Sequence, residues 1–164
     1  LSEIDKAERR ALKTGIPALF RLNGTSDIDY TDIIKERPKS LFYDYSKVLS
    51  NVRKNTLANY DLTYSASMFS KQSRAAFKKA VKAGHRIAVA FNTKGLDSDE
   101  LQISHSLASF DKTDLRHLDG AVVGSLTRKG SSKAVRAADN LQENSFFVTA
   151  ANLVAFNDII AVGG

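Results

Sequence analysis

The chain has 164 residues, of which 43% are hydrophobic and 26% are charged, and its formal net charge is +6. This size and composition are typical of one globular domain with a single hydrophobic core. No apolar run reaches the roughly 18 residues that a membrane span needs, and without cysteine the segment can hold neither disulfides nor cysteine-bound iron–sulfur clusters. The sequence therefore predicts a cytoplasmic protein, and its positive charge favours anionic partners, nucleic acid among them.

The amino-terminal residues have the spacing of a helix. Leu1, Ile4, Ala7 and Leu12 fall on one helical face, and Gly15 is a stop signal. Because the first residue is not methionine and the helical pattern has already begun there, we expect the chain to be the carboxyl-terminal part of a longer protein. We expect residues 1–164 to form a single α/β domain.

Short apolar stretches with helix-like segments between them occupy most of the chain. A strand that returns parallel to its neighbour needs a crossover of about a dozen residues, usually a helix. The pattern therefore predicts an α/β fold with a mostly parallel sheet of β-α units. The predicted strands are residues 18–23, 41–46, 61–67, 86–92 and 121–126, and the clearest predicted helices are residues 31–37 and 70–83.

Three further segments are less regular. Residues 95–100 have the composition of a loop, and residues 101–110 alternate weakly enough to be a strand or an excursion across the end of the sheet. Residues 128–133 form a basic loop. The apolar patches beyond residue 144 predict an extra strand and a helix, or a docking tail.

Alternation along the strands separates two faces. One set is mainly apolar, and we expect helices to cover it: Ala18, Phe20, Leu22, Leu41, Tyr43, Tyr45, Leu62, Tyr64, Ala66, Ile87, Val89, Phe91, Val122, Gly124 and Leu126. The other set is more polar: Arg21, Asn23, Phe42, Asp44, Ser46, Asp61, Thr63, Ser65, Ser67, Ala88, Ala90, Asn92, Val123 and Ser125. A parallel sheet covered on both faces has continuous apolar strands, which this sheet lacks. The alternation predicts a partial or open (β/α) barrel with polar groups inside.

Binding sites of parallel α/β sheets lie at the carboxyl ends of the strands. The polar residues at these ends are Asn23, Ser26, Asp27, Asp44, Lys47, Ser65 and Asn92, and the ionisable loop with Asp114 and Arg116 could join them. Their mixture of anion-binding donors and carboxylates predicts a site for an anionic, phosphate-bearing small molecule. A divalent ion on Asp27 and Asp44 is the weaker alternative.

A structural role is the alternative for the same residues. Small polar side chains can satisfy one another inside a crowded barrel, and Arg21 and Asp44 on adjacent strands could form an architectural charge pair. The loop around Asp114 could be a salt-bridged surface turn. Because none of the known phosphate-loop, nucleophile or metalloprotease motifs is present, the sequence predicts no reaction and leaves the cofactor unknown.

Two other functions compete with the small-molecule hypothesis. A basic module could bind nucleic acid without sequence preference through Lys71, Arg74, Lys78, Lys79, Lys82, Arg128, Lys129 and Lys133. The same lysines could instead form a solvated face, with some of them near the carboxyl end of a helix where its dipole favours cations. A structural or host-interaction protein could self-associate through an open sheet edge.

Several blocks of the chain resemble the phage gene product 88-like family. They are residues 21–29, 41–47, 111–116, 122–126 and 129–130, in that order. The resemblance implies a phage or prophage protein of unassigned activity, and the blocks include Asn23, Ser26, Asp27, Asp44, Lys47, Asp114 and Arg116. Longer members of the family carry an upstream cysteine-rich segment similar to radical S-adenosylmethionine enzymes. In this protein, such cysteines would have to lie upstream of residue 1. If the natural protein lacks them, radical chemistry is excluded.

Overall fold

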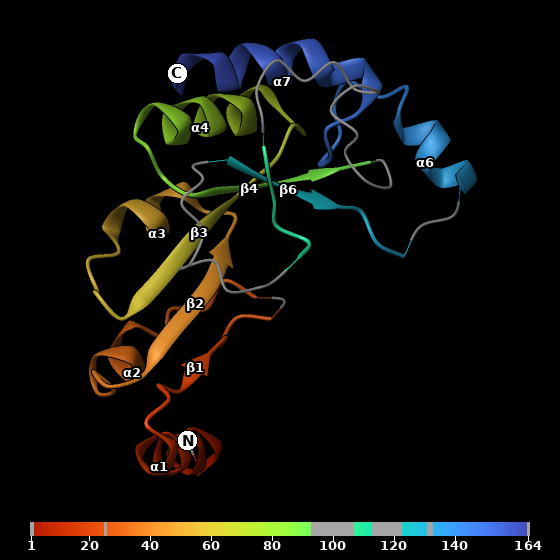
Figure 1. The fold of residues 1–164 in the computed structure, drawn as a ribbon. Coiled ribbons are helices and arrows are strands. Elements are labelled where there is room, and N and C mark those ends of the chain that lie inside the picture. The colour runs from red at the N-terminus through yellow and green to blue at the C-terminus, as the bar shows by residue number, and fades with distance from the viewer. Residues whose placement is uncertain (1, 25, 93–106, 113–122, 131–132, 164) are drawn as a thin grey trace.

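A computed structural model describes residues 2–24, 26–92, 107–112, 123–130 and 133–163 (Figure 1). Its strands form one parallel sheet in the order β1-β2-β3-β4-β6-β5. They are β1 (Leu19–Phe20), β2 (Leu41–Ser46), β3 (Tyr60–Ala66), β4 (Ile87–Phe91), β5 (Ala108–Ser109) and β6 (Val123–Thr127). The predicted parallel α/β fold is confirmed. Among the described strands the sheet is open, because β1 and β5 are its edges.

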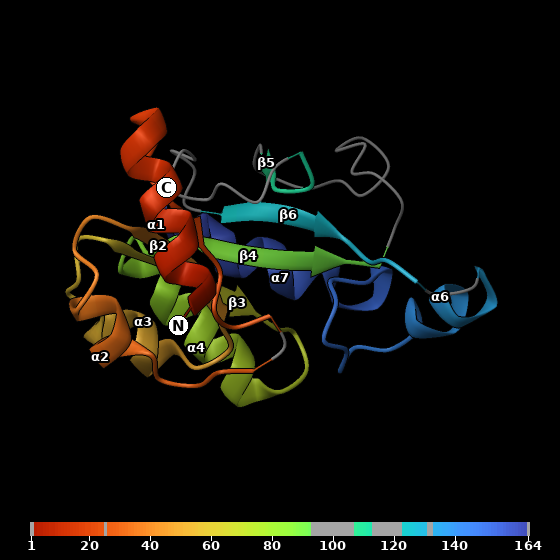
Figure 2. The same ribbon diagram turned by 90° about the horizontal axis from the view of Figure 1, so that it is seen from below.

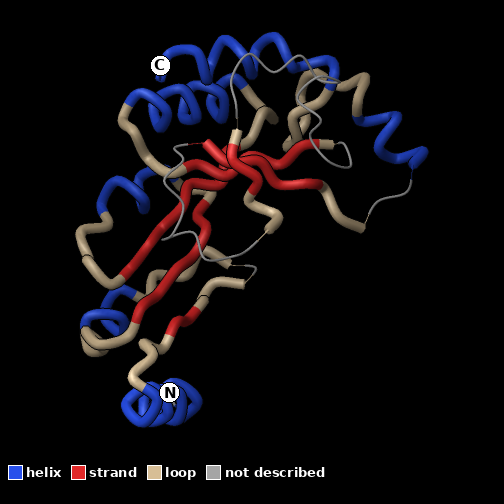
Figure 3. Tube along the Cα trace, viewed as in Figure 1, coloured by secondary structure: helices blue, strands red, loops and turns tan. Residues whose placement is uncertain are grey.

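Helices alternate with these strands. They are α1 (Ser2–Thr14), α2 (Thr31–Lys35), α3 (Leu49–Lys54), α4 (Lys71–Lys82), α6 (Lys133–Asp139) and α7 (Leu153–Ile160), with short 3₁₀ turns at Ala150–Asn152 and Ala161–Gly163. Figures 1 and 2 show α3, α4 and α7 against one face of the sheet, whereas α1 lies beyond β1. Figure 3 shows how strongly the sheet twists between β2 and β6. None of the described helices has both the length and the apolar character needed to cross a lipid bilayer.

Local signals account for most element boundaries. The Ser70 hydroxyl accepts a hydrogen bond from the Ser73 N–H at 3.0 Å and caps α4, and Gly84 follows that helix with a φ of 68° that favours glycine. The predicted first strand shortens to β1. Its continuation leaves the ladder because the Asn23 N–H donates to the Asp44 side chain at 2.8 Å.

The hydrophobic core lies between the sheet and helices α4 and α7. The ring of Phe156 from α7 packs 5.9 Å from Phe77 of α4 and 5.2 Å from Phe91 of β4, centroid to centroid. All three side chains are buried. Val148 bridges in parallel to Phe91, and the Met68 N–H donates to the Phe146 carbonyl at 3.4 Å. The carboxyl-terminal residues thus supply both a strand-like segment, at the ends of β3 and β4, and a helix.

The strand register corrects the predicted faces of two strands. Asp44 pairs with Leu62 and Ser46 with Tyr64, so the buried set of β2 lies on the helix-covered face together with the core. In β6, Val123 and Ser125 share that face, because they pair with Ile87 and Val89 of β4. The prediction that Leu41, Tyr43, Tyr45, Gly124 and Leu126 face the helices is wrong. The tyrosines mislead because their rings carry apolar surface yet tolerate partial exposure.

The sheet face opposite the helices carries different side chains near β5 and near β1. Near β5, Gly124 pairs with Ala88, and a Cβ at Gly124 would overlap the ring of Phe110. The buried Phe110 ring therefore packs directly on the backbone of β6. At the side of β1, β2 and β3 this face instead carries polar side chains.

Candidate functional site

A cavity of about 370 Å³ opens at the carboxyl ends of β1, β2 and β3, on the face opposite the core. Small-molecule pockets typically measure about 300–1,000 Å³. Its lining residues are Arg21, Asn23, Gly24, Ser26, Asp27, Tyr45, Lys47, Ser65 and Leu126. The structure therefore brings together Asn23, Ser26, Asp27, Lys47 and Ser65 of the predicted ligand site.

Asn23 shapes the loop that forms one wall of this cavity. Its side-chain oxygen accepts hydrogen bonds from the Ser26 hydroxyl at 2.9 Å and from the Ile28 N–H at 3.1 Å. Its side-chain nitrogen donates to the Ile28 carbonyl at 2.9 Å. Because its amide group is used within the loop, buried Asn23 positions Ser26 and Asp27 and leaves little of its own amide for a ligand.

Asp44 lies behind this loop and is fully buried. Its carboxylate accepts hydrogen bonds from the Asn23 N–H at 2.8 Å and from the Tyr60 hydroxyl at 3.2 Å. Burial raises the pKa of Asp44 above its usual value, while these hydrogen bonds and the positive charge of Arg21 act in the opposite direction. Burial and the nearby Asp44 carboxylate raise the pKa of Tyr60 as well. Asp44 therefore supports the loop from the helix-covered side of the sheet.

The prediction that Arg21 and Asp44 share a face of the sheet is wrong, although the charge of Arg21 still favours the ionised form of Asp44. The Arg21 guanidinium lies 5.0 Å from the centre of the Tyr45 ring, on the cavity side of the sheet. A cation stacked on an aromatic face keeps its charge and a fixed orientation while it stays exposed. Arg21 and Tyr45 are thus cavity residues that the predicted site lacks. The exposed arginine two residues before Asn23 is the sequence signal that could have indicated them.

The mouth of the cavity combines two cations and one carboxylate. The Lys47 N–H donates to the Asp27 carboxylate at 3.1 Å, which fixes the loop to the end of β2. The Lys47 ammonium lies 5.1 Å from the centre of the Phe146 ring. With Arg21 and Lys47 against Asp27, the formal charge at the mouth is positive, and this favours an anion.

Below the mouth lies Thr63, which pairs with Tyr45 and is fully buried. Within the described part of the chain, its hydroxyl has no hydrogen-bond partner. Buried polar groups are nearly always paired, so this hydroxyl carries an energetic cost. Ser65, two residues further along β3, lines the cavity on the same face.

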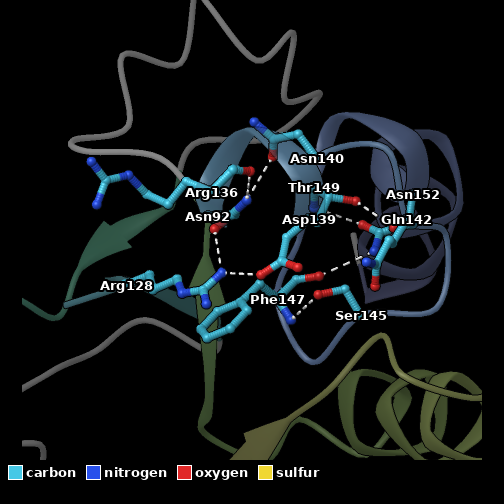
Figure 4. Close-up of polar contacts among 10 residues, drawn as sticks. All are labelled: Asn92, Arg128, Arg136, Asp139, Asn140, Gln142, Ser145, Phe147, Thr149 and Asn152. Atoms are coloured by element: carbon cyan, nitrogen blue, oxygen red, sulfur yellow. Dashed lines mark hydrogen bonds and ion pairs between the residues drawn. The ribbon is translucent and has the colours of Figure 1, made fainter. Parts of the chain in front are cut away.

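Asn92 belongs to a second polar cluster, at the carboxyl ends of β4 and β6 (Figure 4). Its side-chain nitrogen donates to the Arg136 carbonyl at 2.6 Å and to the Asn140 side chain at 3.0 Å, and its oxygen accepts from Arg128 at 2.8 Å. Arg128 also forms an ion pair with Asp139. The cluster anchors α6 to the sheet, and the structure does not place Asn92 on the cavity lining.

The other predicted residues are distributed over the surface. Lys71, Lys78, Lys79 and Lys82 are exposed on α4, and Lys129 and Lys133 are exposed beyond β6. Arg74 is partly buried and donates to the Met68 carbonyl at 2.9 Å, so it ties the start of α4 to the chain before it. Asp114 and Arg116 lie outside the described residues. Among the described residues, no three histidine or carboxylate side chains gather as a metal site would require.

The described residues also form other cavities. One, of about 610 Å³, lies between α1 and residues 36–40 and has a mainly apolar lining that includes Leu12 and Ile16. A cavity of about 340 Å³ lies on the helix-covered side of loop 23–28, where Lys35, Lys54 and Tyr60 contribute. Asn23 and Asp27 line this cavity as well as the one at the strand ends, so loop 23–28 separates the two.

The fold and the cavity define an open parallel α/β protein with a polar, small-molecule-sized cavity at its strand ends. The family model of gene product 88 matches residues 1–142, and the chain belongs to this family. The family resemblance drawn from the sequence blocks is thereby confirmed. Comparisons with curated proteins and with solved structures give no significant match.

Proposed function

We propose that this member of the gene product 88 family is a phage or prophage protein that binds an anionic small molecule in the cavity at the ends of β1, β2 and β3. The observation that carries the proposal is the meeting of Arg21 and Lys47 with the Ser65 hydroxyl in one cavity. Charged donors and hydroxyls suit phosphate oxygens. As a phage-encoded protein it would act in the cytoplasm of the host cell.

Calorimetric titration with ribose 5-phosphate tests this proposal. A hydrogen bond to a charged group contributes about 1.5–3 kcal/mol, so Arg21→Gln and Lys47→Gln should each weaken binding about tenfold or more. Lys79→Gln removes the same charge from exposed α4 and should leave binding unchanged. Absence of binding to the wild-type protein, or equal weakening by all three substitutions, would contradict a specific anion site.

Nucleic-acid binding is the second candidate, supported by the exposed lysines of α4. Of the basic residues proposed for it, Arg74 and Arg128 hold parts of the fold together, and Figures 1 and 2 place α4 well away from α6. Counterion release makes such binding fall steeply with salt. Lys78→Gln/Lys79→Gln should then abolish binding to single-stranded DNA at low salt and leave ribose 5-phosphate binding intact.

Self-association through an open sheet edge is the third candidate. The edge strands β1 and β5 have two residues each, and edges this short offer little backbone for pairing with another chain. Light scattering over a wide concentration range tests it, since association must increase the mean mass. A constant monomer mass would remove this candidate.

A further inference from the structure

Two cations and two aromatic rings form a row along the carboxyl end of the sheet. The Lys47 ammonium lies 5.1 Å from the centre of the Phe146 ring, and the Arg128 guanidinium lies 4.4 Å from that of Phe147. The two rings meet edge to face, with centroids 5.4 Å apart. The row therefore joins the candidate cavity, through Lys47, to the Arg128 cluster shown in Figure 4.

The two ends of this row differ in how firmly the cation is held. Arg128 donates to Asn92 and pairs with Asp139, and its side chain is only 15% exposed, so it stays on Phe147. Lys47 is exposed, and in the described part of the chain its ammonium has no carboxylate within ion-pair distance. Lys47 can therefore turn toward an anion in the cavity and uncover one face of Phe146.

Phe146 itself is held in place by the backbone. Its carbonyl accepts from the Met68 N–H at 3.4 Å, and Val148 bridges to Phe91 two residues further on. The ring is partly exposed and stands beside a cavity residue. A partly exposed aromatic ring at a fixed position next to an anion site is a suitable platform for a flat, aromatic part of the ligand.

We infer that the anionic ligand is a nucleoside phosphate. This inference rests on the proposed anion site: Arg21 and Lys47 hold the phosphate, and the base stacks on the face of Phe146 that Lys47 leaves. Asp27, exposed at the mouth of the cavity, is an acceptor for a ribose hydroxyl. Because every base has an aromatic face, this stacking should tolerate different bases.

Calorimetric titration of the whole chain with three probes separates the two parts of the ligand. The probes are adenosine monophosphate, ribose 5-phosphate and adenosine. Stacking of one base strengthens binding by about tenfold in typical cases, so the monophosphate should bind about tenfold tighter than ribose 5-phosphate. Adenosine should bind more weakly than adenosine monophosphate because it lacks the anion.

Two neighbouring phenylalanines supply the variant and its matched control. Phe146→Leu should bring the affinity for adenosine monophosphate down to that for ribose 5-phosphate, whose own affinity should not change. Phe147→Leu should leave the ratio of the two affinities near its wild-type value, because Arg128 already covers that ring. Phe146→Trp keeps an aromatic face and should preserve the ratio, which provides a reading even if Phe146→Leu folds poorly.

The outcomes distinguish the inference from the function on which it rests. Equal affinities for adenosine monophosphate and ribose 5-phosphate in the wild-type protein would overturn the nucleoside assignment and leave the anion site standing. An unchanged ratio in a folded Phe146→Leu variant would overturn the role of Phe146. If neither phosphate binds, both the inference and the proposed anion site are wrong.

Discussion

Asp44 shows how a single buried side chain supports the candidate site. An unpaired buried charge costs several kcal/mol or more, so a carboxylate at this position needs donors. Asn23 and Tyr60 supply them, and through Asn23 the carboxylate supports the loop that carries Ser26 and Asp27. A core residue thereby controls the shape of a cavity on the other side of the sheet.

The hydrogen bond from Tyr60 to Asp44 should make stability depend on pH. Because the pKa of Asp44 is raised in the folded protein, protonation of Asp44 stabilises the folded state. This stabilisation is complete below the unfolded pKa near 3.8, and it is lost as pH rises through the folded pKa. Tyr60→Phe removes a donor to the ionised carboxylate and should lower the free energy of unfolding by about 1–3 kcal/mol at pH 7. The loss should shrink as Asp44 becomes protonated in acid.

Urea denaturation at pH 7 and pH 4 measures this difference. Tyr64→Phe, on the same strand, is the matched control, since no hydrogen bond of the Tyr64 hydroxyl to Asp44 is present. A loss in Tyr60→Phe that is the same at both pH values would count against coupling to Asp44.

Thr63→Val should stabilise the protein. The change keeps the shape of the side chain and removes a buried hydroxyl that has no partner among the described residues. Leaving a polar group unsatisfied costs about 1–3 kcal/mol, so we expect the free energy of unfolding to rise by about 1 kcal/mol, measured by urea denaturation. Ser65→Ala, on the partly exposed part of the same strand, should change it much less. A destabilised Thr63→Val would show that the hydroxyl has a favourable contact.

At the scale of elements, α1 depends on charged contacts for its attachment. Arg37, which follows α2, pairs with Asp5 and Glu8 of α1, and the Ser40 hydroxyl donates to Glu8 at 2.7 Å. The hydrogen bond from Arg37 lowers the pKa of Asp5. The pKa of Glu8 is lowered mainly by the hydrogen bond from Ser40 and, to a smaller extent, by the hydrogen bond from Arg37. These contacts join the first helix to the beginning of β2.

Acid should therefore release α1 before the sheet unfolds. The pKa values of Asp5 and Glu8 are lower in the folded protein than their unfolded values of 3.8 and 4.5. Their ionised side chains therefore stabilise the fold at any pH above the unfolded pKa values, and this stabilisation is lost as pH falls through the folded pKa values. Amide hydrogen exchange of α1 should accelerate relative to α4 over that interval. Arg37→Gln should produce the same relative acceleration at pH 7. Equal protection of α1 and α4 down to acid unfolding would refute this attachment.

For the whole molecule, the residues beyond the family match complete the core. The match ends at residue 142, whereas Val148 bridges to β4 and Phe156 packs between Phe77 and Phe91. The sheet and α4 alone would leave these rings exposed. Residues on both sides of position 142 thus pack into one hydrophobic core.

Phe156→Ala should lower the free energy of unfolding by about 3–5 kcal/mol, the usual cost of removing a buried aromatic ring. Val154→Ala lies on the same helix with 75% of its surface exposed and should change stability by less than about 0.5 kcal/mol. Urea titration followed by circular dichroism compares the two. A small effect of Phe156→Ala would mean that α7 contributes little to the core.

Local residue patterns were sufficient for the longer strands, for helices α2 and α4, and for the end of the sheet where the cavity lies. The strand predicted at residues 41–46 is β2, and the helix predicted at 70–83 is α4 because Ser70 and Gly84 mark its ends. Parallel strands separated by helices then place their carboxyl ends at one edge. That was enough to predict Ser26, Asp27, Lys47 and Ser65 near one another.

Only the tertiary structure decided which face each strand presents and which strand ends share a cavity. Alternation divides Asp44 from Tyr45, but the hydrogen-bond register with β3 determines that Asp44 faces the core and Tyr45 the cavity. Asn23 and Asn92 look equivalent in sequence, yet α6 and the segment around Val148 occupy the end of β4. The steric rules of a strand act between adjacent residues, whereas strand pairing and packing depend on residues far apart in the chain.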